Sequence, residues 1–317
     1  MKLSIVTTLY RSAHFLEEFH RRASAAAQRA FGDEYEIILV NDGSPDNSLQ
    51  LALELQSSDK HLQLVDLSRN FGHHPAIVAG LACSSGQHVF LIDCDLEEQP
   101  EWLALFVDKM LEDSADVVFG VQQERVSSPL SNLLGEMFWS ALNIMSSVHI
   151  PHNPMTCRLM TRAYVDSLLG VEDRVLYLAG VFAWTGFKQV SISLKKIPRA
   201  KAQTSTYKLS RKLLQVADSF ASFSVAPLSL IFFTGLMIWL GSVLFAVLLL
   251  IQKLIHPDTV LSGFASIMLS LWFLGGTIIL FLGVLGLYVA KIFQEVKRRP
   301  LYIVRNTYRG DRSDQRP

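Results

Sequence analysis

The sequence is poor in charged residues and in cysteine, and both shortages exclude classes of protein. Charged residues make up 18% of the 317 positions, against about a quarter in an average soluble domain. The 3 Cys, at Cys83, Cys94 and Cys157, have no regular spacing, which excludes a disulfide-rich scaffold and fits a reducing compartment. Half of the residues are apolar, so a disordered chain is excluded, and 18 Gly exclude a collagen-like one.

The net charge of zero conceals four segments of different charge. Residues 1–185 carry 12 Lys and Arg against 24 Asp and Glu, whereas residues 186–224 carry 8 against 1. Residues 225–289 contain one Lys and one Asp, and residues 290–317 carry 8 basic side chains against 3 acidic ones. An acidic body, a basic block, an uncharged segment and a second basic block therefore follow one another.

The uncharged segment is long enough to cross a membrane twice. Val225–Ile251 has 27 residues without a charge and Val260–Val289 has 30. About 20 apolar residues span the hydrocarbon core, and buried helices of soluble proteins rarely contain apolar runs of this length. The sequence therefore predicts a transmembrane hairpin over residues 225–289, with spans at about 227–251 and 262–289.

Basic residues flank this hairpin on its outer sides. The short loop between the spans holds only Lys253, whereas the flanks hold Lys208, Arg211, Lys212, Lys291, Lys297, Arg298 and Arg299. The positive-inside rule then places both termini in the cytoplasm. Residues 206–224 have the pattern of an amphipathic helix at the membrane interface, with a surface helix of the body as the alternative. Residues 290–317 are expected to form a basic cytoplasmic tail.

The body, residues 1–205, alternates strand-like and helix-like segments. Apolar strands are expected at 2–10, 34–42, 62–70, 88–95 and 115–121, and helices at 15–30, 48–58 and 75–85. This order predicts an α/β fold with a mostly parallel sheet, whose ligands bind beyond the carboxyl ends of the strands.

Carboxylates lie at the end of the fourth expected strand. Asp93 and Asp95 are two positions apart where this strand gives way to a loop, and Asp42 and Asn70 lie at the ends of two other strands. Oxygen ligands of this kind suit Mg²⁺ or Mn²⁺, which binds through one or two carboxylates together with the phosphates of a substrate. The pattern predicts a metal and phosphate site.

The segments SIVTTLY, VNDGSPDNS, LSRNFGHHPAIVAGL and LIDCDLEEQPEW, in this order, resemble family 2 glycosyltransferases of the GT-A fold. The two apolar runs and the ending KIFQEVKRRPLYIVR make the chain similar to the polyprenyl-phosphate branch, which includes bactoprenol glucosyltransferases and dolichol-phosphate mannose synthases. The resemblance runs from residue 3 to about residue 305. It implies a GT-A-type, mostly parallel sheet with helices on both faces, followed by the interfacial helix and the transmembrane hairpin.

The activity implied by the resemblance is that of a metal-dependent hexosyltransferase. A sugar would pass, with inversion, from a nucleotide sugar, most often a UDP-sugar in this branch, to polyprenyl (undecaprenyl) phosphate. The reaction would take place at the cytoplasmic face of the bacterial inner membrane and supply cell-surface glycan modification. The implied partners are the nucleotide sugar, polyprenyl phosphate and membrane lipids, without nucleic acid, and a homo-oligomer formed through the spans is allowed.

Roles for single residues follow in part from the resemblance. Positions matching its nucleotide-sugar site are Thr8, Tyr10, Asp42, Asn70, Asp93 and Glu97, with Asp93 and Asp95 as metal ligands and catalytic residues. Ser205 and Tyr207 match a segment that closes over phosphates. From charge alone, we expect Arg199 and Lys201 to hold the phosphates, with help from Arg125 and Arg158 of the body. Alternatively, the basic block only orients the chain in the membrane according to the positive-inside rule.

One departure from the family bears on the chemistry. Many relatives have an Asp, proposed as a base, where this chain has Thr156. A phosphate with a second pKa of about 6 needs little deprotonation, so catalysis does not require that Asp. Glu172 or Asp173 is an alternative base, and the position of His73 and His74 at a helix start favours a structural or phosphate-facing role.

Two other functions compete with this reading. The Thr156 departure keeps open a catalytically inactive, membrane-anchored protein that binds nucleotide sugars as a scaffold. A processive polysaccharide synthase would carry a Q-x-x-R-W segment and more spans, and the sequence has neither.

Overall fold

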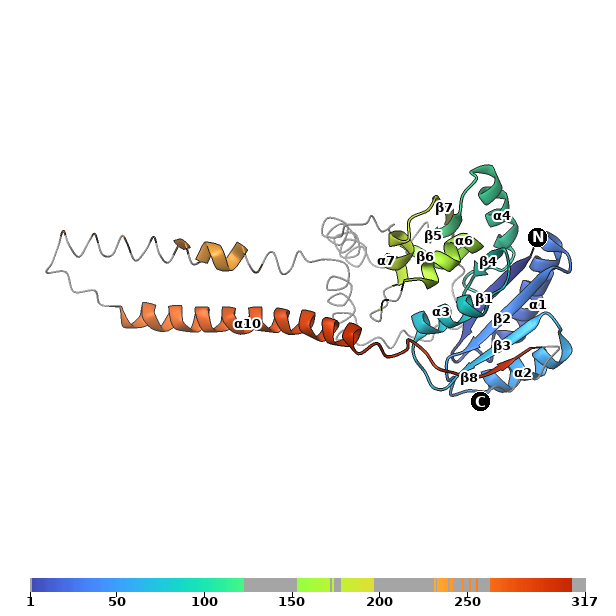
Figure 1. Ribbon diagram of the computed structural model, residues 1–317, viewed down its shortest axis with the longest axis horizontal. Coiled ribbons are helices and arrows are strands. Elements are labelled where there is room, and N and C mark those ends of the chain that lie inside the picture. Colours follow the sequence, from blue (N-terminus) through green and yellow to red (C-terminus); the bar gives the residue numbers. More distant parts are fainter. Residues whose placement is uncertain are drawn as a thin grey trace. The chain divides into compact units, whose positions relative to one another are not determined.

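The computed structural model describes residues 2–122, 153–171, 173, 178–196 and 263–309, together with 231, 233–238, 240–241, 244, 247, 251 and 255. These residues belong to two compact units (Figure 1). The first contains the sheet with its helices and also the chain from Arg298 onward. The second contains the long helix α10 (Phe264–Val296).

The first unit follows the expected alternation of strands and helices as far as residue 122, with α4 as an additional helix. Its strands are β1 (Leu3–Leu9), β2 (Tyr35–Asn41), β3 (Leu62–Leu67), β4 (His88–Leu91), β5 (Val117–Gln122), β6 (Pro154–Thr161), β7 (Gln189–Leu194) and β8 (Val304–Tyr308). Its helices are α1 (Leu16–Phe31), α2 (Ser48–Ser58), α3 (His73–Cys83), α4 (Trp102–Glu112), α6 (Arg162–Leu169) and α7 (Leu178–Trp184). Helix α4, strands β6 and β7 and helices α6 and α7 were not predicted from the sequence. An apolar helical stripe predicted between Pro129 and Val148 lies outside the described residues.

The eight strands form one sheet in the order β7-β5-β6-β4-β1-β2-β3-β8. β1 pairs in parallel with β2 and β4, β2 with β3, and β5 with β7, whereas β6 and β8 are antiparallel to their neighbours. The prediction of a mostly parallel α/β sheet is confirmed. The carboxyl ends of β1 to β4 consequently meet at one edge of the sheet, where the polar residues of the sequence patterns lie.

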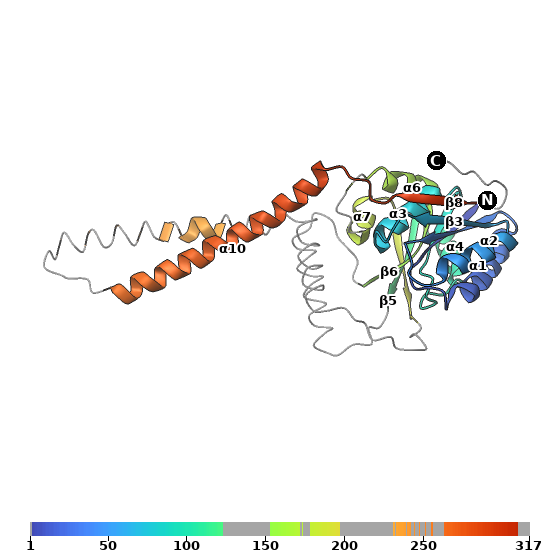
Figure 2. The ribbon, with the colours of Figure 1, turned by 90° about the horizontal axis from the view of Figure 1, so that it is seen from below.

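Helices cover both faces of the sheet (Figure 2). α1 contacts α2 and α4 on one face, and α3 contacts α6 on the other. On the α1 face, Phe90 of β4 meets Phe106 of α4 edge-to-face with ring centroids 5.5 Å apart. Because both faces are covered, the central strands β1 to β4 are buried along almost their whole length.

Helix α3 lies unusually close to the sheet, and its glycine makes this possible. A Cβ built on Gly80 would lie 2.4 Å from Val6 Cγ1 and 2.9 Å from Val40 Cγ2. The close approach fixes the position of the helix that begins at His73, next to the carboxyl ends of β1 and β2.

The segment after α10 does not remain a separate tail. β8 lies antiparallel beside β3, with Leu64 opposite Tyr308 and Asp66 opposite Asn306 (Figure 1). The expected basic tail over residues 290–317 therefore differs from the structure, in which the helix continues to Val296 and residues 304–308 join the sheet. Strand β8 pairs with the backbone groups at the edge of β3, which would otherwise be unpaired. Because β8 has only five residues and most of its side chains are polar, its sequence does not have the apolar pattern that predicts a strand.

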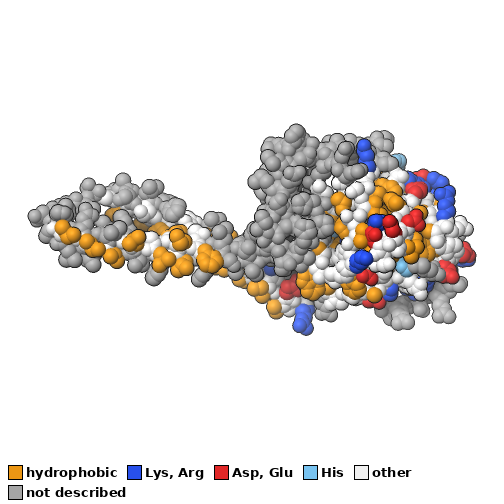
Figure 3. Space-filling model, turned by 90° about the horizontal axis from the view of Figure 1, so that it is seen from above, with side chains coloured by type: hydrophobic (Ala, Val, Ile, Leu, Met, Phe, Trp, Pro, Cys, Tyr) orange, Lys and Arg blue, Asp and Glu red, His pale blue; other side chains and the backbone are white. Residues whose placement is uncertain are grey.

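Helix α10 is apolar and is not covered by protein in the described part of the chain. Hydrophobic side chains are exposed along it, among them Ile267, Leu271, Ile279 and Leu282 (Figure 3). Within the described residues, one helical stretch, Leu274–Phe293, has the length and composition needed to cross a membrane. The first expected span is described in part, as helix at residues 233–238 and 240–241 and at a few single positions. The expected interfacial helix at 206–224 lies outside the described residues.

We expect Gly80→Ala to destabilise the body. The added methyl group overlaps Val6 and Val40, and overpacking of this kind costs about 1–3 kcal/mol, more than the roughly 0.5–1 kcal/mol gained from alanine in a helix. The melting temperature of the detergent-solubilised protein measures the effect. Gly170→Ala is the control, because its Cβ would meet only backbone oxygen atoms, at 3.3 and 3.7 Å. Equal melting temperatures for the two variants would contradict the prediction.

Candidate active site

Three polar residues form a row across neighbouring strands at the carboxyl edge of the sheet. Val6 of β1 pairs with Leu91 of β4, and Leu91 pairs with Arg158 of β6. If the parallel register of β1 and β4 is continued by two residues, Thr8 lies opposite Asp93. If the antiparallel register of β4 and β6 is continued in the same way, Thr156 lies opposite Asp93 on its other side. A hydrogen bond from the Thr156 side chain to Asp93 is one of the interactions that act on this carboxylate.

His73 connects this row to helix α3. Its Nδ1 lies 3.1 Å from Thr8 Oγ1, and its Nε2 lies 3.5 Å from Asp93 Oδ1. His73 is the first residue of α3, and its side chain is half exposed, so the imidazole is accessible at the edge of the sheet. Desolvation by the surrounding protein lowers the pKa of His73, whereas the negative charges of Glu98, Asp42 and Asp95 act to raise it.

The turn after β4 gathers three further carboxylates. Asp95 Oδ1 accepts a hydrogen bond from the backbone N–H of Glu97, which closes the turn. The side chain of Glu98 is fully buried, and its Oε1 accepts a hydrogen bond of 3.1 Å from the backbone N–H of Thr156. Its Oε2 lies 3.4 Å from the backbone N–H of Asp93. Glu98 therefore joins the turn to strand β6.

Lys196 is the cation of this acidic cluster. It lies two residues beyond β7, and its Nζ is 3.4 Å from Glu98 Oε1 and 3.8 Å from Glu97 Oε2. Burial alone would lower the pKa of Lys196, but the charges of Glu98 and Asp93 raise it above its usual value. Lys196 thus stays charged and connects the end of β7 to the turn after β4.

Crowding of the carboxylates changes their protonation. Burial, together with the charge of Asp95, raises the pKa of Asp93 to about 6, although Lys196 opposes the rise. Burial and the charge of Asp93 raise the pKa of Glu98 to about 7. A bound cation would relieve this repulsion, because it would favour the ionised forms of both groups.

Asp42 uses its carboxylate to hold two loops together. Its Oδ1 accepts a hydrogen bond of 2.7 Å from Phe71 N–H, and its Oδ2 accepts one of 3.0 Å from Gly72 N–H. Its backbone carbonyl accepts a hydrogen bond from Asn70 Nδ2. Gly43 allows the close approach: its φ is +58°, and a Cβ there would lie 2.5 Å from Asn70 N. That Asp42 and Asn70 also contact a nucleotide stays a prediction.

The remaining expected site residues fall into two groups. Tyr10 follows β1 at the same edge, is exposed, and has the guanidinium of Arg11 above its ring. Asp173 is exposed between α6 and α7. The expected phosphate-binding residues Arg125, Arg199, Lys201, Ser205 and Tyr207, and the alternative base Glu172, lie outside the described residues.

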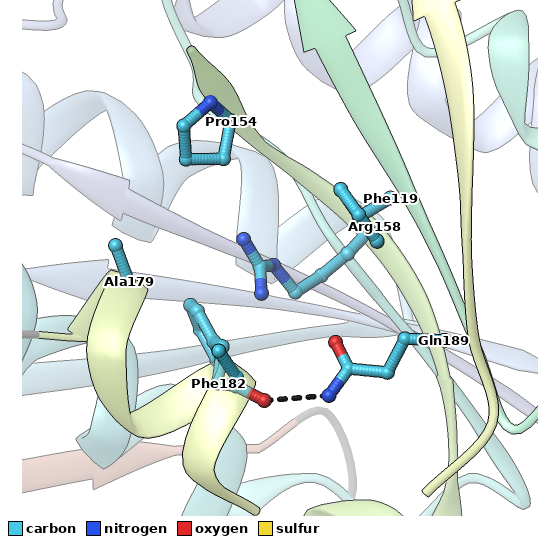
Figure 4. Close-up of a pocket in the computed structure, with 7 residues that line it drawn as sticks. Phe119, Pro154, Arg158, Ala179, Phe182 and Gln189 are labelled. Atoms are coloured by element: carbon cyan, nitrogen blue, oxygen red, sulfur yellow. Dashed lines mark hydrogen bonds between the residues drawn. The ribbon is translucent and has the colours of Figure 1, made fainter. Parts of the chain in front are cut away.

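Arg158 lies in a small pocket between β6 and α7 (Figure 4). Its guanidinium carbon is 3.4 Å from the centre of the Phe182 ring, and it donates hydrogen bonds to the carbonyl oxygens of Met155 and Thr156. Burial lowers the pKa of Arg158 to about 10. Its expected contact with an acceptor phosphate stays a prediction.

Asp93 and Asp95 are the residues of this cluster that could hold a divalent cation. Among the described residues, no three His, Cys, Asp or Glu side chains are arranged to hold a metal ion by themselves. Asp93 and Asp95 nevertheless offer hard oxygen ligands in a region of excess negative charge, and Mg²⁺ or Mn²⁺ commonly completes such a pair with substrate phosphates.

Residues 4–169 match the model of glycosyl transferase family 2. This chain belongs to that family. A Mycobacterium tuberculosis protein whose name places it among glycosyltransferases is 42% identical over 100% of this chain and 91% of its own length. A prophage-derived bactoprenol glucosyl transferase of Shigella flexneri is 30% identical over 98% of this chain and 100% of that protein. The predicted family is confirmed.

The fold of this family 2 glycosyltransferase is also found in a solved structure. A mannosyltransferase from Pyrobaculum calidifontis, in complex with GDP-Man and Mn²⁺, has a TM-score of 0.50 and 16% identity. The similarity covers 92% of this chain and 84% of that one. At this identity the match supports the GT-A fold and nothing more.

Three members of the site were not assigned to it from the sequence. Glu98 and Lys196 were not singled out, and His73 was expected to be structural or to face a phosphate. The run of Asp93, Asp95, Glu97 and Glu98 within six residues was the available signal, because so many carboxylates require a nearby cation. The sequence does not show which lysine supplies this positive charge, because the position of Lys196 depends on where β7 ends.

We expect the contribution of Asp93 to the stability of the metal-free, nucleotide-free protein to fall as the pH rises from about 4 to about 6. The folded state holds a proton on Asp93 up to its raised pKa of about 6, whereas the unfolded state releases it near its ordinary value. Melting temperatures measured in chelator across this range give the slope of stability against pH. Asp93→Asn removes the titrating group and should make this slope more positive than in the wild type, whereas Asp108→Asn, at an exposed position on α4, should leave it unchanged. Equal slopes for the wild type and Asp93→Asn would contradict the assignment.

Proposed function

We propose that the protein transfers a sugar, with inversion, from a nucleotide sugar to polyprenyl phosphate at the cytoplasmic face of the membrane. The observation that carries the proposal is the full-length similarity to a bactoprenol glucosyl transferase, which covers 98% of this chain and all of that protein. The similarity therefore includes the two uncharged runs as well as the catalytic body. A nucleotide-sugar enzyme acting on a soluble acceptor would not need these runs.

The reaction places two anions next to each other. An oxygen of the acceptor phosphate forms a bond to the anomeric carbon, while the bond from that carbon to the diphosphate oxygen breaks. The electron pair of the broken bond leaves with the nucleoside diphosphate. Because the acceptor phosphate is largely dianionic near neutral pH, Thr156 in place of an acidic residue is compatible with the reaction.

The residues at the carboxyl edge can bind and orient the donor. Asp93 and Asp95 would hold Mg²⁺ or Mn²⁺ together with the diphosphate, and the ion would stabilise the negative charge of the leaving group. His73, held between Thr8 and Asp93, stands beside this position. Lys196 keeps the turn after β4 in place by pairing with Glu97 and Glu98.

The connectivity of the sheet supports a two-span anchor. β7 and β8 belong to one sheet, so the chain leaves the sheet near residue 194 and returns to it at residue 304 on the same side of a membrane. A chain that does so crosses the bilayer an even number of times. With α10 as one crossing, residues 197–262 supply the other, and Val225–Ile251 is the uncharged run in that stretch with sufficient length.

We expect Asp95→Asn to reduce sugar transfer about 100-fold or more, since several kcal/mol of charge stabilisation at the leaving diphosphate are lost. The assay incubates the purified protein with Mg²⁺ or Mn²⁺, undecaprenyl phosphate and a panel of labelled UDP- and GDP-sugars, and measures label in the lipid. Asp166→Asn, an exposed carboxylate on α6, is the control. If the wild type binds nucleotide but transfers no sugar, the protein is an inactive scaffold instead.

We expect both ends of the hairpin to lie in the cytoplasm and its loop to lie on the other side. A fluorescent reporter that is active only in the cytoplasm should be active when fused after Pro317. A cysteine placed in the loop by Asp258→Cys should react with a membrane-impermeant maleimide applied to intact spheroplasts. A loop cysteine that reacts only after lysis would contradict the two-span arrangement.

A further inference from the structure

Strand β8, which follows α10, contacts the candidate site through the side chain of Arg305. β8 pairs with β3 in regular register from Leu64 to Asp66, and the register then shifts. Asp66 faces Asn306 and Leu67 faces Val304, which leaves Arg305 as the extra residue of a bulge. A bulge redirects the side chain of its extra residue, and here Arg305 turns back toward β3.

Arg305 binds two groups at the end of β3. Its Nη1 lies 3.5 Å from Asp66 Oδ2, and its Nη2 donates a hydrogen bond of 2.6 Å to the carbonyl oxygen of Ser68. Ser68 N–H in turn donates to the carbonyl oxygen of Ile303. The first residue of the loop after β3 is therefore held to the returning strand through both its N–H and its carbonyl group.

From Asp66 the contacts continue to the loop after β2. The Asp66 side chain is almost fully buried, and its Oδ1 accepts a hydrogen bond of 2.7 Å from Asn41 Nδ2. Asn41 Oδ1 accepts a hydrogen bond from the backbone N–H of Ser44. Arg305 thus acts on both loops at this edge, residues 41–44 and residues 68–72.

These two loops are the ones that carry Asp42 and Asn70 and lead into His73. The Asp42 carboxylate fixes them to each other through the N–H groups of Phe71 and Gly72. α3 begins directly after the second loop, and its first residue contacts Thr8 and Asp93. Any shift of the second loop would therefore move the imidazole beside the cluster of carboxylates.

We propose that Arg305 is a positioning residue of the nucleotide-sugar site, through which the strand returning from the membrane segment orders the loops 41–44 and 68–72. The inference rests on the proposed function for the identity of the ligand, but not for the order of the loops. The segment after α10 is then part of the donor site rather than an appendage of the membrane anchor.

The experiment uses the full-length protein in detergent or nanodiscs. Arg305→Ala leaves the buried Asp66 without its cation, and should raise the KM for the nucleotide sugar and weaken UDP or GDP binding about tenfold. The KM for undecaprenyl phosphate should stay within twofold of the wild type. Arg305→Lys should restore part of the donor affinity, because it returns the positive charge but not the forked geometry.

Amide hydrogen exchange supplies a readout that does not depend on activity. Peptides covering residues 68–73 should exchange faster in Arg305→Ala, because the N–H groups of Phe71 and Gly72 lose their ordered acceptor. Asn306→Ala is the matched control: it lies on the same strand, and its side chain contacts the Tyr308 hydroxyl instead of the loops. This control should change neither exchange nor donor affinity.

A double-mutant cycle separates positioning from general loss of stability. Asp66→Asn and Arg305→Ala should be strongly non-additive in nucleotide affinity, because both remove the same ion pair. The proposal is overturned if Arg305→Ala has wild-type exchange at 68–73 and wild-type nucleotide affinity, or if Asn306→Ala reproduces its effects. If the wild type transfers no sugar to the lipid, the proposed function fails, while exchange and nucleotide binding still decide the role of Arg305.

Discussion

Repulsion among the carboxylates after β4 is the constraint on which the site depends. Asp93, Asp95, Glu97 and Glu98 stand within six residues, and the fully buried Glu98 cannot be relieved by water. Lys196 offsets part of this charge, and backbone N–H groups of Asp93 and Thr156 satisfy the oxygens of Glu98. Burial and mutual repulsion still raise the pKa values of Asp93 and Glu98, and a bound cation would favour the ionised forms of both groups.

The same edge of the sheet unites residues that belong to very different parts of the chain. Thr8 comes from β1, His73 from the start of α3, Asp93 from the turn after β4 and Thr156 from β6. Parallel pairing of β1 with β4 and antiparallel pairing of β4 with β6 bring them into one row. The Thr156 side chain contributes a hydrogen bond to Asp93, so this position supports the carboxylate without adding another charge.

The apolar segment lies in the chain between two strands of the same sheet, β7 and β8. The chain leaves the sheet after β7, passes through the uncharged region and returns as β8 at the opposite edge. This return closes the exposed edge of β3, which would otherwise offer unpaired backbone groups to another chain. It also brings Arg305 to the buried carboxylate of Asp66, so that the segment following the apolar helix takes part in the body's polar network.

The sequence by itself determined the family, the strands and helices from β1 to β5 except α4, the acidic pair Asp93 and Asp95, and the uncharged segment. These features follow from local patterns, because periodicity, charge and motif spacing are properties of neighbouring residues. The tertiary structure alone decided that His73 joins Thr8 to Asp93, that Lys196 pairs with Glu98, and that β8 returns to β3. Each of these contacts depends on strand register and helix placement, which are set by packing between segments far apart in the chain.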